Sequence, residues 1–448
     1  MKKYPKYRQS GVEWLGEVPG HWEVKKLSHL TNKIGSGKTP SGGATVYQDE
    51  GVLFVRSQNV YDDGLRLDDV VYISDEIDDD MACSRVKPSD VLLNITGASL
   101  GRTCIAPSDL ARANVNQHVC IIRMCDATKA PFVALFLKSK VAKGFFENAQ
   151  TGSAREGLNF EQIAAFRIPL PPLPEQQSIA TYLDRETGRT DTLIDKKQRI
   201  VELLKEKRVA MVSRAVTKGL DPKVKMKPSG VEWLGEVPEH WEVKKLKHRA
   251  VIRYGIGEPP EYVVEGVPLI RATNVNAGKI ESANLVRVDP SDIPGARIVW
   301  LKAGDIIVVR SGAYTGDSSI IPKAYENSIA GFDMVVSVRN THSEFVAYAL
   351  LSKYLKDGQI YLEKLRAAQP HLNAEELGNC TLLLPPLPEQ QTISTYLDRE
   401  TAKLDTLISK VDTAIDTLKE YRTALISAAV TGKICVTDGL GGMKDEHK

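Results

Sequence analysis

The sequence predicts two homologous α/β domains joined by two long antiparallel coiled-coil helices, in a pseudo-twofold, circular arrangement. Residues 171–187 recur as residues 385–401, with fifteen of seventeen positions identical. Residues 10–28, which we call the first frame segment, recur as the second frame segment, 229–247, with seventeen of nineteen identical. Ten of eleven heptad positions from Ile393 to Ala428 are apolar, as in a coiled coil. The chain therefore repeats one order: frame segment, variable block, long helix.

Each copy of the PPLPEQQ motif predicts the start of a long helix. Pro174 and Pro388 suit a first helical position, and the glutamates that follow them suit the positive end of the helix dipole. Only six of eleven heptad positions are apolar in the first copy, where neighbouring Ile194, Val201, Leu203, Val212 and Ala215 widen the stripe. At ~1.5 Å per residue, about forty residues make a rod of roughly 60 Å. Because neither apolar stripe would be soluble alone, each helix is the simplest partner of the other. The expected pairing positions are Ile179, Leu183, Leu193, Ile200, Leu204, Ile393, Leu397, Leu404, Leu407, Leu418 and Leu425.

The two variable blocks share an outline but little sequence. In both, short β-branched runs separated by Gly, Asn, Asp and Pro predict strands joined by turns. One amphipathic helix is expected per block, over Pro131–Phe145 and Ser343–Lys356. The full division is 1–28 N-terminal frame, 29–169 first domain, 170–220 central helix, 221–247 repeated frame, 248–383 second domain, 384–434 C-terminal helix and 435–448 flexible tail.

Bulk composition excludes few functions. The 448 residues carry a formal net charge of +2, so a nucleic-acid binder would have to gather its basic residues on one face. Six cysteines form no CxxC pair, which is typical of reduced thiols in a cytoplasmic protein. No secretory h-region follows the basic N-terminus, and no apolar run reaches membrane-spanning length, so we expect no membrane association.

No sequence pattern predicts a catalytic site. Residues 35–39, GSGKT, resemble the end of a phosphate-binding loop, but Asn32 occupies the position where that motif needs its first glycine. Glu23-Val24-Lys25 and its repeat Glu242-Val243-Lys244 lack an upstream Pro-Asp, so they are interpreted as packing rather than as nuclease residues. No His/Cys cluster indicates zinc, and no nucleophile elbow supports Ser-His-Asp chemistry. We expect no catalytic residue, no metal and no bound cofactor in this chain.

Polar and basic loop residues of the variable blocks are the candidates for binding. Arg, Asn and Gln side chains read base edges in pairs of hydrogen bonds, and glycines let backbone N–H groups approach phosphates. Solvated surface loops remain the alternative for each residue. The DNA-binding candidates are Lys38, Thr39, Arg56, Gln58, Asn59, Arg102, Asn116, Gln117, Ser153, Arg155, Arg271, Thr273, Asn274, Arg310, Ser311, Tyr314, Gln369 and His371.

The duplicated frame, W-L-G-x-V-P-x-H-W-x-x-x-x-L, followed by a diverse domain and then PPLPEQQ with a long helix, resembles the specificity (S) subunits of type I restriction–modification enzymes. The resemblance covers essentially the whole chain. It implies two target-recognition domains, each reading one half of a bipartite, asymmetric site in double-stranded DNA. It further implies long helices that set the half-site spacing and dock two methyltransferase (M) subunits, with restriction/motor (R) subunits joining for cleavage. S-adenosylmethionine, ATP and magnesium are expected on those partners.

Two other classes of function stay open at this stage. A coiled-coil scaffold could display two ligand-binding heads without any DNA role. A variable block could alternatively hold an active site that no motif announces. Binding of random duplex DNA separates the first alternative, and incubation of the chain alone with DNA, magnesium and S-adenosylmethionine separates the second.

The order of the repeats predicts where the frame segments pack. The second frame segment follows the first long helix directly, whereas the first frame segment has no helix before it in the chain. A pseudo-twofold relation therefore places Trp14, Leu15 and Trp22 beside the end of the second helix, near Val430–Gly432. Their repeats, Trp233, Leu234 and Trp241, would pack beside the end of the first helix.

Overall fold

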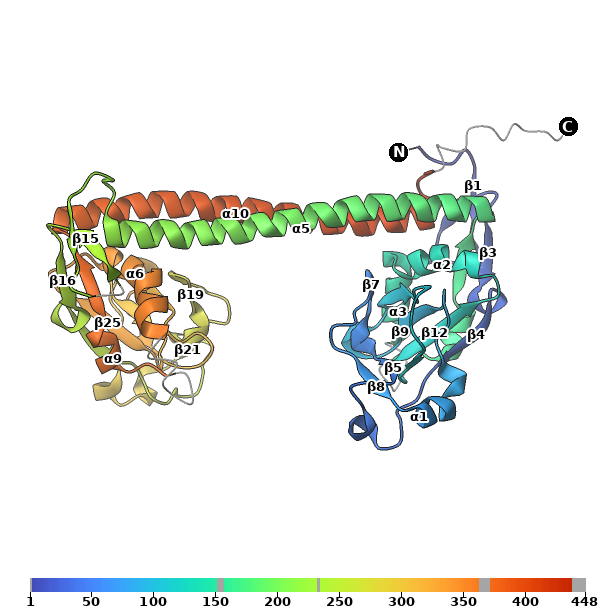
Figure 1. The fold of residues 1–448 in the computed structure, drawn as a ribbon, viewed down its shortest axis with the longest axis horizontal. Coiled ribbons are helices and arrows are strands. Elements are labelled where there is room, and N and C mark those ends of the chain that lie inside the picture. The colour runs from blue at the N-terminus through green and yellow to red at the C-terminus, as the bar shows by residue number, and fades with distance from the viewer. Residues whose placement is uncertain (1, 151–156, 232–233, 362–370, 437–448) are drawn as a thin grey trace. The chain divides into compact units, whose positions relative to one another are not determined.

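The computed structural model describes residues 2–150, 157–231, 234–361 and 371–436. It divides into a first unit, Met1–Lys196 with Thr413–Lys448, and a second unit, Lys197–Asp412. Both long helices, α5 (Leu173–Lys218) and α10 (Leu387–Val430), pass from one unit to the other. Each unit thus contains one globular domain, one frame segment and half of each long helix (Figure 1).

The first unit is built on a four-stranded sheet of order β10-β9-β12-β4 and a three-stranded sheet of order β11-β5-β8, in which β11 and β5 are parallel. Strand β3 of the frame segment pairs with β13, directly before α5. Its elements are β1 (Tyr7–Gln9), β2 (Glu17–Pro19), β3 (Glu23–Lys26), β4 (Thr31–Ser36), β5 (Val52–Val55), β6 (Val60–Tyr61), β7 (Gly64–Leu65), β8 (Val71–Ile73), α1 (Asp75–Asp80), β9 (Val91–Asn94), β10 (Thr103–Ile105), β11 (Ala113–Val115), β12 (Val119–Met124), α2 (Ala130–Leu137), α3 (Lys140–Gln150), α4 (Phe160–Ala165) and β13 (Arg167–Leu170).

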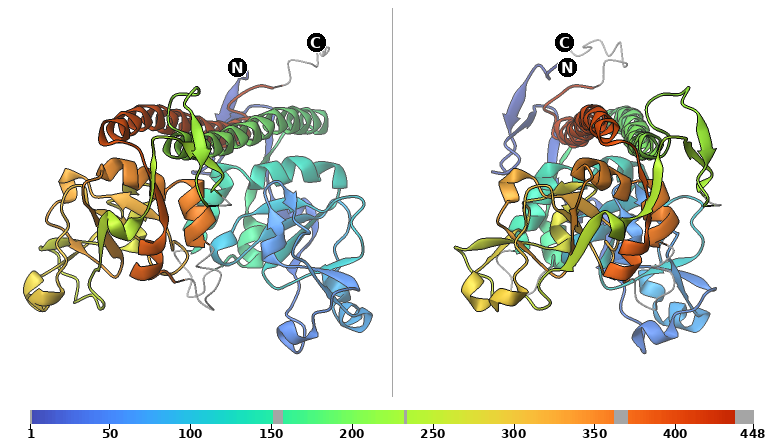
Figure 2. Two further views of the ribbon diagram at one scale, coloured as in Figure 1. Left: turned by 60° about the vertical axis from the view of Figure 1, so that its left-hand side comes forward. Right: turned by 90° about the vertical axis from the view of Figure 1, so that its left-hand side faces the viewer.

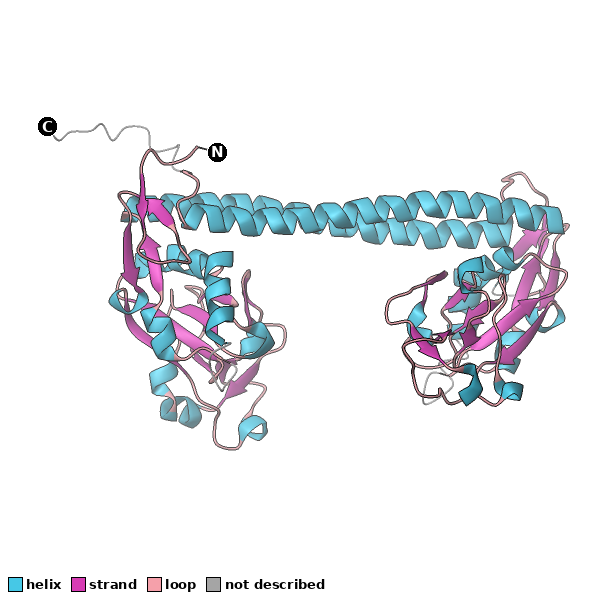
Figure 3. Ribbon diagram, turned by 180° about the vertical axis from the view of Figure 1, so that it is seen from behind, coloured by secondary structure: helices cyan, strands magenta, loops and turns pink. Residues whose placement is uncertain are grey.

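The second unit repeats this topology strand for strand. Its sheets have the orders β23-β22-β25-β17 and β21-β18-β24, β18 and β24 are parallel, and β16 of the second frame segment pairs with β26. Its elements are β14 (Met226–Pro228), β15 (Glu236–Pro238), β16 (Glu242–Lys245), β17 (Ala250–Tyr254), β18 (Val267–Ile270), β19 (Val275–Asn276), β20 (Lys279–Ile280), β21 (Val286–Val288), β22 (Ile306–Val308), β23 (Ser318–Ile320), β24 (Ile329–Ala330), β25 (Met334–Val338), α6 (Ser343–Leu350), α7 (Lys353–Leu355), α9 (Ala374–Asn379) and β26 (Thr381–Leu384). The prediction of two homologous α/β domains is confirmed (Figure 3).

Within each unit the two long helices run antiparallel. In the second unit Arg208 of α5 lies 3.3 Å from Asp405 of α10, and the two helices are seen side by side in Figure 2. In the first unit the roles are exchanged, because Arg422 of α10 lies 2.8 Å from Asp191 of α5. The same ion pair thus occurs once in each unit with the helices interchanged, as expected for two copies of one repeat.

The predicted pairing positions differ in burial. Ile179, Leu183, Ile393, Leu397, Leu404 and Leu425 are buried, while Leu204 and Leu418 are partly buried. Leu193, Ile200 and Leu407 are instead exposed, the first by 43% and the last by 48% of their surface. Neighbouring Ile194, Val201 and Ile415 are buried in their place. A straight helix of 3.6 residues per turn drifts by ~20° per heptad, so a strict heptad pattern loses the buried face after a few turns.

One helix predicted in each domain is in fact two. In the first unit the chain breaks at Ser139, between α2 and α3, and in the second at Ser352, between α6 and α7. Each break leaves a backbone N–H at the start of the next helix without an intrahelical partner. The Lys140 N–H donates to Ser427 Oγ of α10 at 2.9 Å, and the Lys353 N–H donates to Ser213 Oγ of α5 at 2.9 Å. The breaks therefore dock each domain on a long helix.

The frame segments pack where the repeat order predicts. Trp22 shares a core with Leu425, Ile426 and Val430 at the end of α10, and the Tyr7 hydroxyl donates to the Gly432 carbonyl at 3.0 Å. Trp241 likewise shares a core with Val212, Ala215 and Val216 at the end of α5. Trp14 stacks on Phe166 of its own domain with ring centroids 5.1 Å apart, and so contributes to the same core from the domain side. Its predicted counterpart Trp233 lies outside the described residues.

The glutamate of each PPLPEQQ motif anchors its frame segment. Glu175 accepts a hydrogen bond from the Trp22 indole at 3.2 Å, and its other oxygen lies 2.8 Å from His21 Nε2. Glu389 repeats this arrangement with Trp241 at 3.2 Å and His240 at 2.7 Å. The sequence indicated a carboxylate suited to the helix dipole, and the structure adds a hydrogen-bonded partner for the frame tryptophan.

Candidate nucleic-acid interface

The loops between sheet strands bring together part of the predicted binding set in the first unit. Thr96 Oγ1 lies 2.6 Å from His118 Nδ1, and Gln117 Nε2 lies 2.8 Å from His118 Nε2. Asn116 Oδ1 accepts the His118 N–H at 3.0 Å. This loop follows β11 and forms one connected polar group, which combines hydrogen-bond donors and acceptors. Thr96 was not among the predicted residues, because only the fold places it beside the Asn-Gln-His loop.

Arg56, Gln58 and Asn59 are held by their own loop. Arg56 Nη2 donates to the Asp69 carbonyl at 3.2 Å, and Gln58 Nε2 donates to the Asp69 carboxylate at 2.7 Å. Asn59 is buried and donates to the carbonyls of Arg66 and Asp69. These side chains therefore shape the loop 56–69 in this structure, and their hydrogen-bonding groups are largely engaged within it.

The remaining candidates of the first unit are dispersed or outside the described residues. Lys38 Nζ lies 2.6 Å from Asp80, and the guanidinium of Arg102 covers the Tyr61 ring at 4.5 Å. Thr39 precedes Pro40 in the loop after β4. Ser153 and Arg155 lie outside the described residues.

Backbone packing accounts for the GSGK sequence that resembles a phosphate-binding loop. A Cβ atom on Gly37 would lie 1.6 Å from the Val115 carbonyl oxygen, and one on Gly255 would lie 1.9 Å from the Gly331 oxygen. Only glycine permits this close crossing of two backbone segments. The glycine before Lys38 is thus required by the domain core, and it recurs in the second domain without a following lysine.

In the second unit, Arg271 and Asn274 repeat the loop-shaping role. Arg271 Nη2 donates to the Asn284 carbonyl at 2.7 Å, and its Nη1 lies 3.3 Å from the Tyr262 hydroxyl. Asn274 is buried and donates to the carbonyls of Glu281 and Ala283. Thr273 lies between them in the same short 3₁₀ turn.

Arg310 lies in a different environment, together with Ser311 and His371. Its guanidinium carbon lies over two aromatic rings, 4.0 Å from the centroid of Phe332 and 4.7 Å from that of Tyr254. The backbone of Ser311 forms a β-bridge with that of His371. Tyr314 is exposed in the loop that follows, and Gln369 lies outside the described residues. Tyr254 and Phe332 are apolar residues that the sequence analysis did not select.

A buried carboxylate supports this cluster from below. Asp333 Oδ1 accepts the backbone N–H of Arg310 at 3.2 Å. Burial raises the pKa of Asp333 from its ordinary value of 3.8 to about 6, although hydrogen bonds from backbone N–H groups and the charge of Arg310 oppose this shift. The carboxylate is therefore charged at neutral pH at a cost in folding free energy.

Asp333→Asn is expected to stabilise the protein above pH 6. Because the folded-state pKa of Asp333 lies above its ordinary value, the cost of burying its charge is absent near pH 4, grows between pH 4 and 6, and is complete above pH 6. The amide oxygen can still accept the Arg310 N–H. We expect a gain on the order of 2–3 kcal/mol in unfolding free energy at pH 8 that shrinks towards pH 4. Denaturant unfolding at both pH values measures it, and an equal effect at both would contradict the assignment.

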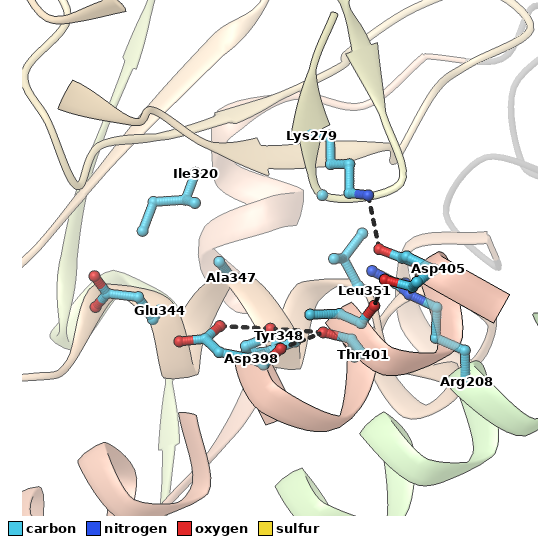
Figure 4. A pocket seen from close by; sticks show the side chains of 13 residues that line it. Arg208, Lys279, Ile320, Glu344, Ala347, Tyr348, Leu351, Asp398, Thr401 and Asp405 are labelled. Carbon is cyan, nitrogen blue, oxygen red and sulfur yellow. Dashed lines mark hydrogen bonds and ion pairs between the residues drawn. The ribbon is translucent and has the colours of Figure 1, made fainter. Parts of the chain in front are cut away.

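A cavity of about 430 Å³ lies between the second domain and its long-helix segments (Figure 4). Its charged side chains are already paired: Lys279 with Asp405 at 2.7 Å, Arg208 with Asp405 at 3.3 Å, and Glu344 with His342 at 3.2 Å. The Tyr348 hydroxyl donates to Asp398 at 2.6 Å. This arrangement connects the domain to α5 and α10, and we interpret it as a structural junction rather than a reaction site.

The described residues contain no group of three or more His, Cys, Asp or Glu placed to hold a metal ion. In the same part of the chain, none of the helices combines the length and apolar character needed to cross a membrane. The chain is thus a duplicated protein. Its two domains share one topology and the same pair of long helices, but they carry different polar side chains on their loops. The chain belongs to the family described as the type I restriction modification DNA specificity domain, whose model matches residues 19–203 and 238–416.

Individual relatives share the whole length of the chain. It is 21% identical over 439 residues to the EcoKI specificity subunit of Escherichia coli K12, covering 94% of this chain and 90% of that one. It is 25% identical over 431 residues to the MjaVIII specificity subunit of Methanocaldococcus jannaschii, covering 94% of each. A solved chain from work on complex assembly and conformational transition of the type I R-M system has a TM-score of 0.68, 16% identity, and coverage of 93% of this chain and 99% of that one. This structural similarity shows that the two chains share a fold.

Proposed function

We propose that this chain is the non-catalytic subunit that gives a type I restriction–modification complex its DNA sequence specificity. In this proposal each globular domain reads one half of a bipartite, asymmetric site in double-stranded DNA. The observation that carries it is the pair of domains with one strand order and different side chains at equivalent loop positions. Two copies of one reader would suit a symmetric target, whereas two diverged readers suit two different half-sites.

The equivalence of the loop positions can be followed in the backbone. The Leu158 N–H donates to the Ile95 carbonyl at 2.9 Å in the first domain, and the Leu372 N–H donates to the Arg310 carbonyl at 2.8 Å in the second. Ile95 follows β9 and Arg310 follows the end of β22, which occupy the same place in their sheets. An apolar residue in one domain thus corresponds to an arginine in the other.

The long helices supply the docking surface for methyltransferase subunits in this proposal. In the second unit Ile200 and Leu203 of α5 and Leu407 of α10 are each more than 40% exposed. Large apolar side chains gathered in one exposed patch favour contact with another protein, and this proposal places these three in such a patch. S-adenosylmethionine, ATP and magnesium would reside on the methyltransferase and the restriction/motor subunits, as the resemblance to the family implies.

Leu203→Asp with Leu407→Asp tests the docking proposal. Because both side chains are exposed, the variant should fold and remain soluble, yet it should lose copurification with the co-expressed methyltransferase subunit. The matched control, Lys205→Asp with Lys410→Asp, changes two exposed lysines of the same helices by twice the charge and should retain more of the complex. Undiminished assembly of the leucine variant would place the methyltransferase elsewhere.

A further inference from the structure

We propose that Arg310 reads a guanine in the half-site bound by the second domain. This inference rests on the proposed function, because it names the base that one part of the interface recognises. It singles out one of the arginines predicted to bind DNA, from the way each of them is held.

The candidate arginines differ in how their guanidinium groups are held. Arg56 and Arg271 hydrogen-bond to carbonyl oxygens of their own loops, which leaves much of each guanidinium engaged in the fold. The Nε of all three arginines is buried without a partner, but the Nη groups of Arg310, unlike those of the other two, make no hydrogen bond or ion pair with any described residue. A buried N–H group without an acceptor costs folding free energy, so a ligand that accepts its hydrogen bonds would be favoured.

Two aromatic side chains contact the Arg310 guanidinium. Tyr254 and Phe332 lie against the Arg310 guanidinium, yet they remain 43% and 41% exposed, so the cluster is at the surface. These ring contacts accept none of the guanidinium's hydrogen bonds, so its Nη groups remain for a ligand. The Ala374 N–H donates to the Tyr254 hydroxyl at 2.8 Å, which fixes one ring. The planar donor fork of Arg310 is thus preorganised.

The N–H groups of Arg310 match the hydrogen-bond acceptors of guanine. Arginine donates through two parallel N–H groups, and guanine presents two acceptors, O6 and N7, on one edge in the major groove. Adenine presents a donor beside its acceptor there, which a donor-only side chain cannot satisfy as well.

The first domain cannot use the same chemistry. The position equivalent to Arg310 is Ile95, which is only 5% exposed. The neighbouring polar group of Thr96, Gln117 and His118 contains both donors and acceptors. The contact proposed for Arg310 is therefore assigned to the half-site of the second domain.

The test uses the complex of the full chain with its methyltransferase subunits and maps the methylated sequence in a randomised DNA library. A chimera with residues 29–169 replaced identifies which half belongs to the second domain. We expect at least one G·C pair in that half to lose discrimination on the order of ten- to a hundredfold in Arg310→Ala. Arg310→Gln should shift preference at the same pair towards adenine, since glutamine pairs with adenine N6 and N7.

Controls distinguish base recognition by Arg310 from an effect on folding and from a contact with phosphate. Arg287→Ala removes another arginine of the same domain, one that donates to the Gly266 carbonyl at 2.7 Å, and should leave the motif unchanged, whatever its effect on the melting temperature. If Arg310→Ala weakens binding equally on all sequences and lowers the salt slope by about one, Arg310 contacts phosphate and the inference is wrong. The inference is also wrong if Arg310→Ala changes the half of the motif read by the first domain, or if it changes neither half. If the unmutated complex recognises no motif, the proposed function itself fails.

Discussion

Leu183→Asp combined with Leu397→Asp is expected to abolish the folded protein. Both leucines have no exposed surface, and each lies in the core where a long helix, a frame segment and a domain meet, Leu183 in the first unit and Leu397 in the second. Losing a buried leucine costs roughly 2–5 kcal/mol, and an unpaired buried carboxylate adds to that cost. The combined loss approaches the whole stability of a typical domain, about 5–15 kcal/mol.

The matched control is Leu193→Asp with Leu407→Asp, two positions that the heptad pattern also predicts to be buried. Because the structure leaves both exposed, this variant should remain soluble with near-native circular dichroism and melting temperature. Expression yield and far-ultraviolet circular dichroism of the two variants decide the question. If both pairs prove equally destructive, the strict heptad seam is right and the drifted seam is wrong.

Replacing the first domain, residues 29–169, with the corresponding block of a relative should change one half of the recognised sequence completely and leave the other half intact. The physical reason is that each domain has its own sheets, and that it joins the frame through the backbone pairing of β3 with β13 and through core side chains such as Phe166 against Trp14, which the block of a relative must also supply. Sequencing of methylated DNA from cells carrying the chimera measures both halves. A change in both halves would mean that the domains do not read independently.

The sequence alone is sufficient for the architecture and insufficient for the reading residues. The repeats, the prolines and the apolar stripe predict the long helices to within a few residues of α5 and α10. The sequence does not predict the helix break at Ser139. The hydrogen bond that stabilises it joins the Lys140 N–H to Ser427, which is far away along the chain. Leu193 was misplaced because a heptad count ignores the drift of a straight helix.

The distinction between Arg271 and Arg310 shows why composition cannot select a binding residue. Both arginines follow a β-branched run and precede small polar residues, so they look alike in the sequence. Only the fold brings the Asn284 carbonyl to Arg271 and the rings of Tyr254 and Phe332 to Arg310. Such partners are brought together by sheet topology, which local sequence patterns do not specify.

The central claim is that two diverged copies of one domain read two different half-sites. Its most direct measurement is the sequence methylated by this chain together with its methyltransferase subunits, mapped base by base in genomic DNA. We predict two short defined stretches, different from each other and separated by a fixed number of unspecified base pairs. A single uninterrupted site, or two halves that are inverted copies of each other, would contradict it.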